Sequence, residues 1–412
     1  MHVSPAQVLA FRLAAHALAA RDVAPLAALA SWSVQDSPPG AAALALAARS
    51  AAAEPGWLDA ALHDERSAVA LYNPRTATAV VPAAEVAAYC AGLLPPDAEA
   101  LRFVLGRALP PPGDGPEPDE ALRIALPAFE QALDGRELSR DDLHAALRDH
   151  LPPELLPWCE GCQSHHARRG LLVAASLHGR LCVAGRAGRQ PLFARTDQWI
   201  GAQATPPASA HDRDAAAAEV VRRHLRASGP STPALFAGWA GIAPHHAQRA
   251  WALVEDELTE VAIERPDGGD GRAWLLADDV PALAGAEPAR GTLLLAAGDP
   301  LLLARDRELL LADRALRRRA WPAINPPGLL LHDGAPAALW RGRKRGKLLA
   351  VELEPIGRPL SASVLKTVER IAERLATHRG CTSATVDGEP LGLRPRVPSE
   401  ELAQRARSSR RT

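Results

Sequence analysis

Apolar residues follow two different spacings along the chain, and the changes between them predict the order of its elements. Over residues 5–20 and 41–52, apolar side chains recur at the three- and four-residue spacing of an amphipathic helix. Residues 68–82 instead alternate and are rich in Val and Thr, which predicts two strands on either side of Asn73–Pro74. With short helices over 23–32 and 57–62, the first hundred residues are predicted to form helices followed by a hairpin.

This order of helices followed by a hairpin returns twice. Ser139, followed by two aspartates, predicts the start of one helix, and a second helix is predicted over residues 164–179. Two strands are predicted on either side of a glycine turn at 186–190. In the third pass, helices are predicted over 215–230, 231–241 and 243–258, ahead of a hairpin with a glycine-rich tip. A repeated helix–helix–helix–hairpin plan predicts tandem winged-helix domains.

The composition changes to strand-forming leucine and valine runs from about residue 290. Strands are predicted within 292–314, 328–334 and 336–355, and a last amphipathic helix over 362–377. The predicted fold is α+β, mainly α, with three tandem winged-helix domains and a small barrel-like C-terminal β domain. The predicted bounds are 1–108, 121–200 and 214–285 for the winged helices, 290–395 for the β-rich basic domain and 396–412 for a frayed tail.

Composition narrows the class of protein. Of 412 residues, 47% are hydrophobic and 23% charged, which is typical of a soluble globular chain of several domains. No apolar run approaches the ~18 residues of a membrane span, and no cationic leader opens the chain. Five cysteines in a long chain favour a reducing cytoplasm over a disulfide framework. The net charge of −1 argues against a generally adhesive nucleic-acid binder but leaves room for a local basic face.

Such a basic face is predicted between residues 313 and 347, where nine basic side chains stand against Asp313 and Asp333. The residues predicted to contact a phosphate backbone are Arg317, Arg318, Arg319, Trp340, Arg341, Arg343, Lys344, Arg345 and Lys347. His245 and His246 add to them, because they begin the predicted recognition helix of the third winged helix. A solvated, charged hairpin is the alternative interpretation.

A polar loop interrupts the alanine-rich helices of the first unit in the stretch SWSVQDSPPG. Gln35 and Asp36 are candidates for chemistry, since an amide oxygen orients water and a carboxylate also takes a proton. The alternative is structural, because an Asp before Ser-Pro-Pro-Gly makes a turn and caps the next helix.

The stretch WCEGCQSHH carries Cys159, Cys162 and His166, which offers three corners of a zinc tetrahedron. A structural zinc site closes with a second ligand pair, and none follows at that spacing. We therefore assign no metal and no cofactor, and interpret the stretch as a tight turn ahead of a His-His-x-Arg-Arg run that faces solvent or phosphate.

Two longer blocks of the sequence resemble the winged-helix DNA-binding proteins that include the AlkZ-like DNA glycosylases. The first block is HLRASGPSTPALFAGWAG with RAWALVEDEL, and the second is residues 298–346. The resemblance extends in element order over about residues 5–380. It implies three winged helices and a β-rich domain cupped around duplex DNA, and an enzyme that removes alkylated purines.

The resemblance also places the candidate chemistry. The family's glycosylases carry Gln-x-Gln or Gln-x-Asp on the loop where SVQD stands. If Gln35 is the second member of that pair, Ser33 is the first; if it is the first, Ser37 is its partner, and Asp36 is the neighbouring carboxylate. The family's first hairpin often reads Arg-Gly-Thr-x-His, and here Arg75 begins the comparable run, which ends in Ala79.

Two functions follow from this comparison. The first is a glycosylase that hydrolyses the N-glycosidic bond of bulky, N7-alkylated purines, with Ser33, Gln35 and Asp36 as catalytic candidates. The second is a catalytically silent DNA-binding protein on the same scaffold. Both predict a monomer that binds double-stranded DNA, with Arg75 among the contacts and no membrane partner. A protein-interaction module is a third candidate, because winged helices also bind proteins.

Overall fold

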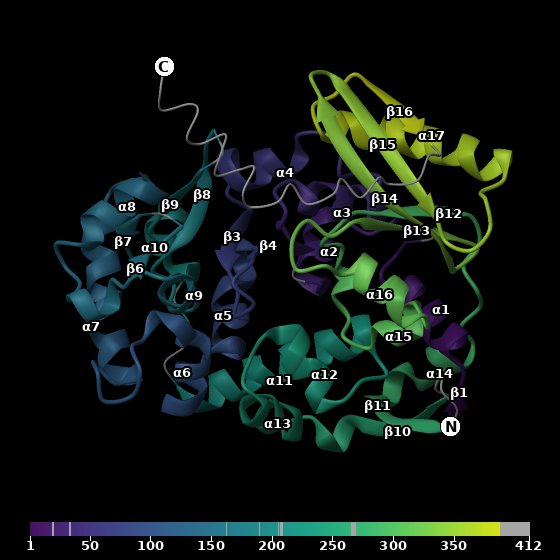
Figure 1. The fold of residues 1–412 in the computed structure, drawn as a ribbon. Coiled ribbons are helices and arrows are strands. Elements are labelled where there is room, and N and C mark those ends of the chain that lie inside the picture. Colours follow the sequence, from purple (N-terminus) through teal and green to yellow (C-terminus); the bar gives the residue numbers. More distant parts are fainter. Residues whose placement is uncertain are drawn as a thin grey trace.

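The computed structural model describes residues 1–387 apart from 19, 33, 162, 189, 205, 207, 208 and 265–268 (Figure 1). Its first part contains β1 (His2–Val3), α1 (Pro5–Ala15), α2 (Pro25–Trp32), β2 (Val34–Gln35), α3 (Ala41–Arg49), α4 (Trp57–Asp59), β3 (Ala68–Tyr72), β4 (Thr78–Pro82), α5 (Val86–Leu93) and α6 (Ala98–Leu105). The second contains α7 (Pro118–Leu133), β5 (Leu138–Ser139), α8 (Arg140–Leu147), β6 (Trp158–Cys159), β7 (Ser164–His165), α9 (Arg169–Leu177), β8 (Cys182–Ala187), β9 (Gln190–Ala194) and α10 (Thr196–Ile200).

The third part contains α11 (Ala210–Ser228), α12 (Pro233–Ala240), α13 (Pro244–Ala252), β10 (Leu258–Glu264), β11 (Asp270–Leu276) and α14 (Val280–Ala284). The last contains β12 (Thr292–Leu295), α15 (Arg307–Leu310), α16 (Arg314–Ala320), β13 (Gly328–His332), β14 (Ala335–Arg345), β15 (Leu348–Pro355), α17 (Ala362–His378) and β16 (Ser383–Asp387). The predicted mixture of helices with a β-rich C-terminal part is confirmed. The predicted tail, 396–412, lies outside the described residues.

Helix starts follow the capping chemistry of the sequence. The side chains of Ser4, Ser139 and Thr232 each accept a hydrogen bond from a backbone amide of the first turn that follows. Two predicted helices are shorter than expected. The helix predicted over 164–179 begins only at Arg169, and the one over 243–258 ends at Ala252.

The hairpins of the first and second parts share one sheet. Its six strands run in the order β2-β4-β3-β8-β9-β5, and Ala70 of β3 pairs with Val183 of β8. In the third part, β1 pairs in parallel with β10, so the chain's first residues complete the β10–β11 hairpin. The hydrophobic contacts of α1 therefore lie far from its neighbours in sequence, against Val261, Ile263 and Leu275.

The C-terminal sheet has the order β12-β13-β14-β15-β16, and α17 connects the parallel pair β15 and β16. One face packs on α17 and on Leu44 and Ala47 of α3, while the other packs on Leu13, Leu301 and Ala320. Figure 1 shows α17 on one side of this sheet and α16 on the other.

The strands predicted within 300–314 were wrong. Residues Pro300–Leu303 form a 3-10 helix and Arg307–Leu310 an α-helix. Asp299 accepts a hydrogen bond from Leu301 N and so begins the first of these turns. The leucines still bury their side chains, but in the core between α1 and the sheet rather than in a ladder.

Two buried ion pairs join the first part of the chain to the last. Arg49 of α3 makes a bidentate pair with Asp299, at 2.7 and 2.8 Å, and both side chains have no exposed surface. Arg12 of α1 makes a second bidentate pair with Asp306, at 2.6 and 2.9 Å. These pairs hold the helices around the polar loop against the C-terminal sheet. None of the helices among the described residues is long and apolar enough to cross a membrane.

Candidate functional site

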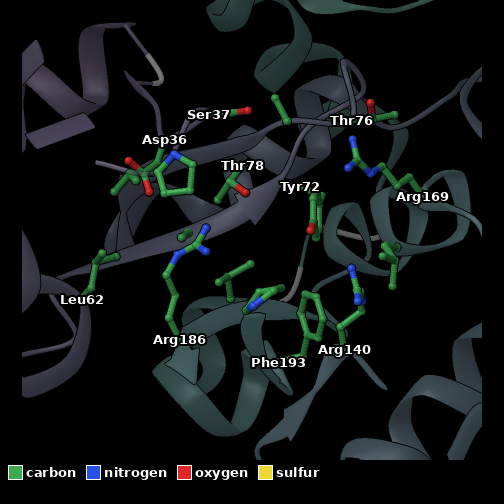
Figure 2. A pocket seen from close by; sticks show the side chains of 18 of the residues that line it. Asp36, Ser37, Leu62, Tyr72, Thr76, Thr78, Arg140, Arg169, Arg186 and Phe193 are labelled. Atoms are coloured by element: carbon green, nitrogen blue, oxygen red, sulfur yellow. The ribbon is translucent and has the colours of Figure 1, made fainter. Parts of the chain in front are cut away.

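A cleft of about 1430 Å³ opens where three parts of the chain meet (Figure 2). Its walls come from the polar loop and the first hairpin, from α8, α9 and the β8–β9 hairpin, and from the C-terminal end of α17. Among the described residues, the lining includes seven arginine or lysine side chains and three aspartate or glutamate side chains, together with four histidines. The basic ones are Arg107, Arg140, Arg168, Arg169, Arg186, Lys344 and Arg379, and the acidic ones are Asp36, Glu54 and Asp59.

Asp36 lies at one end of this cleft. Its backbone amide donates to Thr78 O of β4 at 2.8 Å, and its Oδ1 accepts hydrogen bonds from the amides of Gly40 (2.8 Å) and Ala42 (3.1 Å). The aspartate therefore caps α3, which is the structural role considered from the sequence. Both of these hydrogen bonds use Oδ1, and the residue also lines the cavity.

The environment of Asp36 changes its acidity. Burial raises the pKa of the carboxyl above its ordinary value, and the charge of Asp59 acts in the same direction. The amides of Ala42 and Gly40 and the charge of Arg186 oppose this shift but do not cancel it. Asp36 is thus a half-buried carboxylate at the end of a water-accessible cleft, a setting that suits a general base.

Gln35, the last residue of β2, differs from Asp36, which follows the strand, in that only Asp36 lines the cleft. Gln35 pairs with Ala79 of β4, and neither residue lines the cleft, whereas Asp36 and Thr78 both do. The Gln35 amide Nε2 donates to Ser37 O at 2.9 Å. The structure therefore brings the polar loop beside Ala79 of the first hairpin. Ser33 lies outside the described residues.

Arginines of the second part form the basic wall opposite the polar loop. The pKa of Tyr72 is raised by burial, and Arg169, Arg186 and Arg140 lie close enough to oppose that shift. Figure 2 shows Tyr72 with Arg169 on one side and Arg186 on the other, and with Arg140 and Phe193 below it. Sequence reasoning noted Arg168 and Arg169 only as a run that faces solvent or phosphate and missed Arg140 and Arg186. No short motif identifies those two, since the pairing of β3 with β8 brings them to the cleft.

The C-terminal part supports the polar loop from outside the cleft. A side chain at Gly298 would meet Ser37 O at 2.7 Å, so this glycine allows the turn after β12 to pack directly on the loop. One at Gly40 would lie 3.5 Å from Arg379. Lys344 Nζ donates to Arg379 O at 2.9 Å, which places the predicted basic strand at the edge of the cleft.

The stretch around Cys159 forms a short β6–β7 hairpin at the cleft rim. His166 stacks on His144, with ring centroids 4.5 Å apart and planes 8° from parallel. Burial, with the neighbouring His166 and Arg140, lowers the pKa of His144 to about 4. Cys162 lies outside the described residues, and within the described ranges no three His, Cys, Asp or Glu side chains are grouped as metal ligands.

The predicted DNA contacts fall into different settings. Trp340 is 4% exposed and donates to Leu295 O, so it belongs to the core and not to a surface. His246 is also buried, and burial lowers its pKa to about 4. Arg317 donates to the carbonyls of Leu311 and Ala312, which closes the turn before α16. His245 lies beside Asp97 at 3.2 Å.

Apart from Arg75, the remaining predicted contacts are more accessible. Arg318, Arg319, Arg343, Lys344, Arg345 and Lys347 are exposed, and Arg341 is half-buried. Arg319 pairs with Glu354, and Arg343 Nε lies 3.2 Å from Glu352. Arg75 packs against Gly241 in the hairpin turn, and its Nε and Nη1 are buried without a hydrogen-bond partner. Burial lowers the pKa of this guanidinium to about 10.

Comparison with known proteins supports the resemblance found in the sequence. The model of the family described as "DNA glycosylase AlkZ-like" matches residues 26–378. The fold is similar to that of the DNA glycosylase AlkZ of Streptomyces sahachiroi, with a TM-score of 0.72 and 23% identity over 94% of this chain and 100% of that one. No curated protein sequence matches. The family match covers most of the chain, and the chain therefore belongs to the AlkZ-like DNA glycosylase family.

Proposed function

We propose that this protein is a monofunctional DNA glycosylase that, as a monomer, hydrolyses the N-glycosidic bond of bulky, N7-alkylated purines in double-stranded DNA. The observation that carries the proposal is the position of Asp36, a half-buried carboxylate at the end of a cleft whose other wall is basic. An anionic substrate with a cationic lesion fits this polarity, because arginines attract the phosphates and the carboxylate faces the developing positive charge.

The reaction needs little from the protein beyond these groups. The C1′–N bond breaks with its electron pair passing to the purine, which neutralises the cation of the N7-alkylated base. Water then adds to C1′, and Asp36 accepts the proton that this water loses. Before that transfer the ionised Asp36 stabilises the positive charge on the sugar. Gln35, which faces away from the cleft, serves by holding Ser37 O and so the shape of the loop.

A catalytically silent DNA-binding protein is the second candidate. Gln35 and Ala79 favour it, because neither of these positions places a polar side chain in the cleft. Single-turnover release of N7-methylguanine from a duplex, with binding to the same duplex measured in parallel, separates the two. Release above the spontaneous rate supports the glycosylase. Tight binding with no base release, either from this duplex or from a second duplex with a bulkier N7 adduct, would support the catalytically silent protein.

The acid limb of the pH profile is expected to follow Asp36. Since ionised Asp36 is the active form, activity is present above its raised pKa and lost as the pH falls through it. Removing the like charge in Asp59→Asn is expected to move this limb to lower pH. Removing the opposite charge in Arg186→Gln is expected to move it to higher pH. Single-turnover rates measured over pH 4 to 8 for both variants give the two shifts of the acid limb. If both variants shift the limb in the same direction, Asp36 is not the group that controls it.

The exposed C-terminal end of β14 is expected to contribute to non-specific affinity. Changing Arg343, Lys344 and Arg345 together to alanine should make the slope of log affinity against log salt concentration less steep. The expected change corresponds to the loss of up to about three phosphate contacts. Arg123→Ala, an exposed change on α7 with 73% of its side chain accessible, serves as the control. Fluorescence anisotropy with a labelled duplex at several salt concentrations measures the slope. An unchanged slope would remove β14 from the interface.

A further inference from the structure

An exposed isoleucine lies at the tip of the loop that joins α16 to β13. Ile324 is 86% exposed, more than any other large hydrophobic side chain among the described residues; the next is Phe103, at 54%. A single exposed apolar side chain is common on protein surfaces, so the exposure of Ile324 gains meaning only from the rigid loop that carries it and the basic surface around it.

The loop holds this side chain on a fixed base. At its start, Trp321 Nε1 donates to Leu302 O at 3.0 Å. At its end, a side chain at Gly328 would meet Leu295 O at 2.3 Å, so the backbone there is closely packed against its neighbours. Three prolines, at 322, 326 and 327, restrict the backbone between these anchors. Arg341 Nη1 donates to Asn325 O at 2.5 Å and so fixes the residue next to Ile324.

The surface around the loop is basic, and strand geometry explains why. Trp340 packs on the α17 face of the sheet, and Leu339 packs on the opposite face with Ala320 and Trp321. Because side chains alternate along β14, Arg341, Arg343 and Arg345 continue the face of Leu339, on the side where the loop lies. Arg318 and Arg319 of α16 are exposed beside them. Glu352 and Glu354 offset only part of this charge.

We infer that Ile324 is a wedge that enters between stacked base pairs of a DNA duplex, whose phosphates contact the arginines of β14 and α16. Isoleucine is among the side chains that separate base steps in this way, and the cost of unstacking is offset by contacts with the bent duplex. This inference rests on the proposed DNA-binding function. The contribution of the wedge to affinity does not depend on salt, unlike that of the phosphate contacts, because an apolar side chain releases no counterions.

The test uses the full chain and duplexes that carry a tetrahydrofuran abasic analogue, which keeps the protein in one register. 2-Aminopurine is placed in turn at each position within six base pairs of the analogue. In the wild type, fluorescence is expected to rise several-fold at one step. In Ile324→Ala this rise is lost and affinity falls about tenfold with an unchanged salt slope. Ile324→Leu keeps the signal, and Leu253→Ala, a change at a 39% exposed site, is the matched control.

The outcomes separate this inference from the proposed function. A wild type that binds the duplex with no local fluorescence change, or with one that Ile324→Ala leaves intact, would overturn the wedge and leave the glycosylase standing. A wild type that binds no duplex would overturn both. If Ile324→Ala instead abolishes self-association in light scattering and leaves DNA binding unchanged, the residue is a protein contact and the wedge is wrong.

Discussion

Replacing Asp36 with asparagine is expected to lower the single-turnover rate of base release about 100-fold or more, with duplex affinity unchanged. Asparagine keeps an oxygen at the position that accepts from the Gly40 and Ala42 amides, so the cap of α3 is retained. It removes the negative charge and the site that accepts the proton from water. The loss therefore reports chemistry and not folding.

Gln35→Ala is the matched comparison, because it changes the adjacent residue, which ends β2 and does not line the cleft. Its effect is expected to be less than about tenfold, since only the hydrogen bond to Ser37 O is lost. Rates come from quenched single-turnover reactions and affinities from anisotropy on the same duplex. If Gln35→Ala costs more than Asp36→Asn, the glutamine is the catalytic member of the loop and the carboxylate only caps the helix.

Replacing Asp299 with asparagine is expected to destabilise the protein by about 3–5 kcal/mol. The change leaves the Arg49 guanidinium inside the protein without its carboxylate, where neither side chain has any exposed surface. Arg49 also donates to Ala45 O, and Asp299 accepts from Leu301 N, so the substitution affects both α3 and the turn after β12. Denaturant unfolding followed by tryptophan fluorescence measures the loss.

Two further variants separate a buried charge from a general loss of packing. Glu117→Gln removes one partner of an exposed pair with Arg102, and little change in stability is expected there. The double variant Arg49→Met with Asp299→Leu removes both buried charges and is expected to be more stable than Asp299→Asn alone. If Asp299→Asn is no less stable than Glu117→Gln, the Arg49–Asp299 pair contributes little to holding the first and last parts of the chain together.

Local rules in the sequence predicted most of the elements. Ser139 caps its helix as expected, because a cap depends only on the residues of one turn. The last helix buries Val364, Val368 and Leu375, as its spacing predicted. Prediction failed where a run of leucines is compatible with either a strand or a helix. Residues 300–303 and 307–310 form helical turns because Asp299 and the neighbouring core determine their backbone.

By itself, the sequence determined most of the order of helices and strands, the basic composition of β14 and the position of the polar loop along the chain. Only the tertiary structure decided which polar side chain reaches the cleft. Pairing of β2 with β4 turns Asp36 toward the cavity and Gln35 away from it, although the two are adjacent. Pairing of β3 with β8 adds Arg140 and Arg186 as the opposite wall. Strand register sets these positions, and register depends on contacts between residues far apart in the chain.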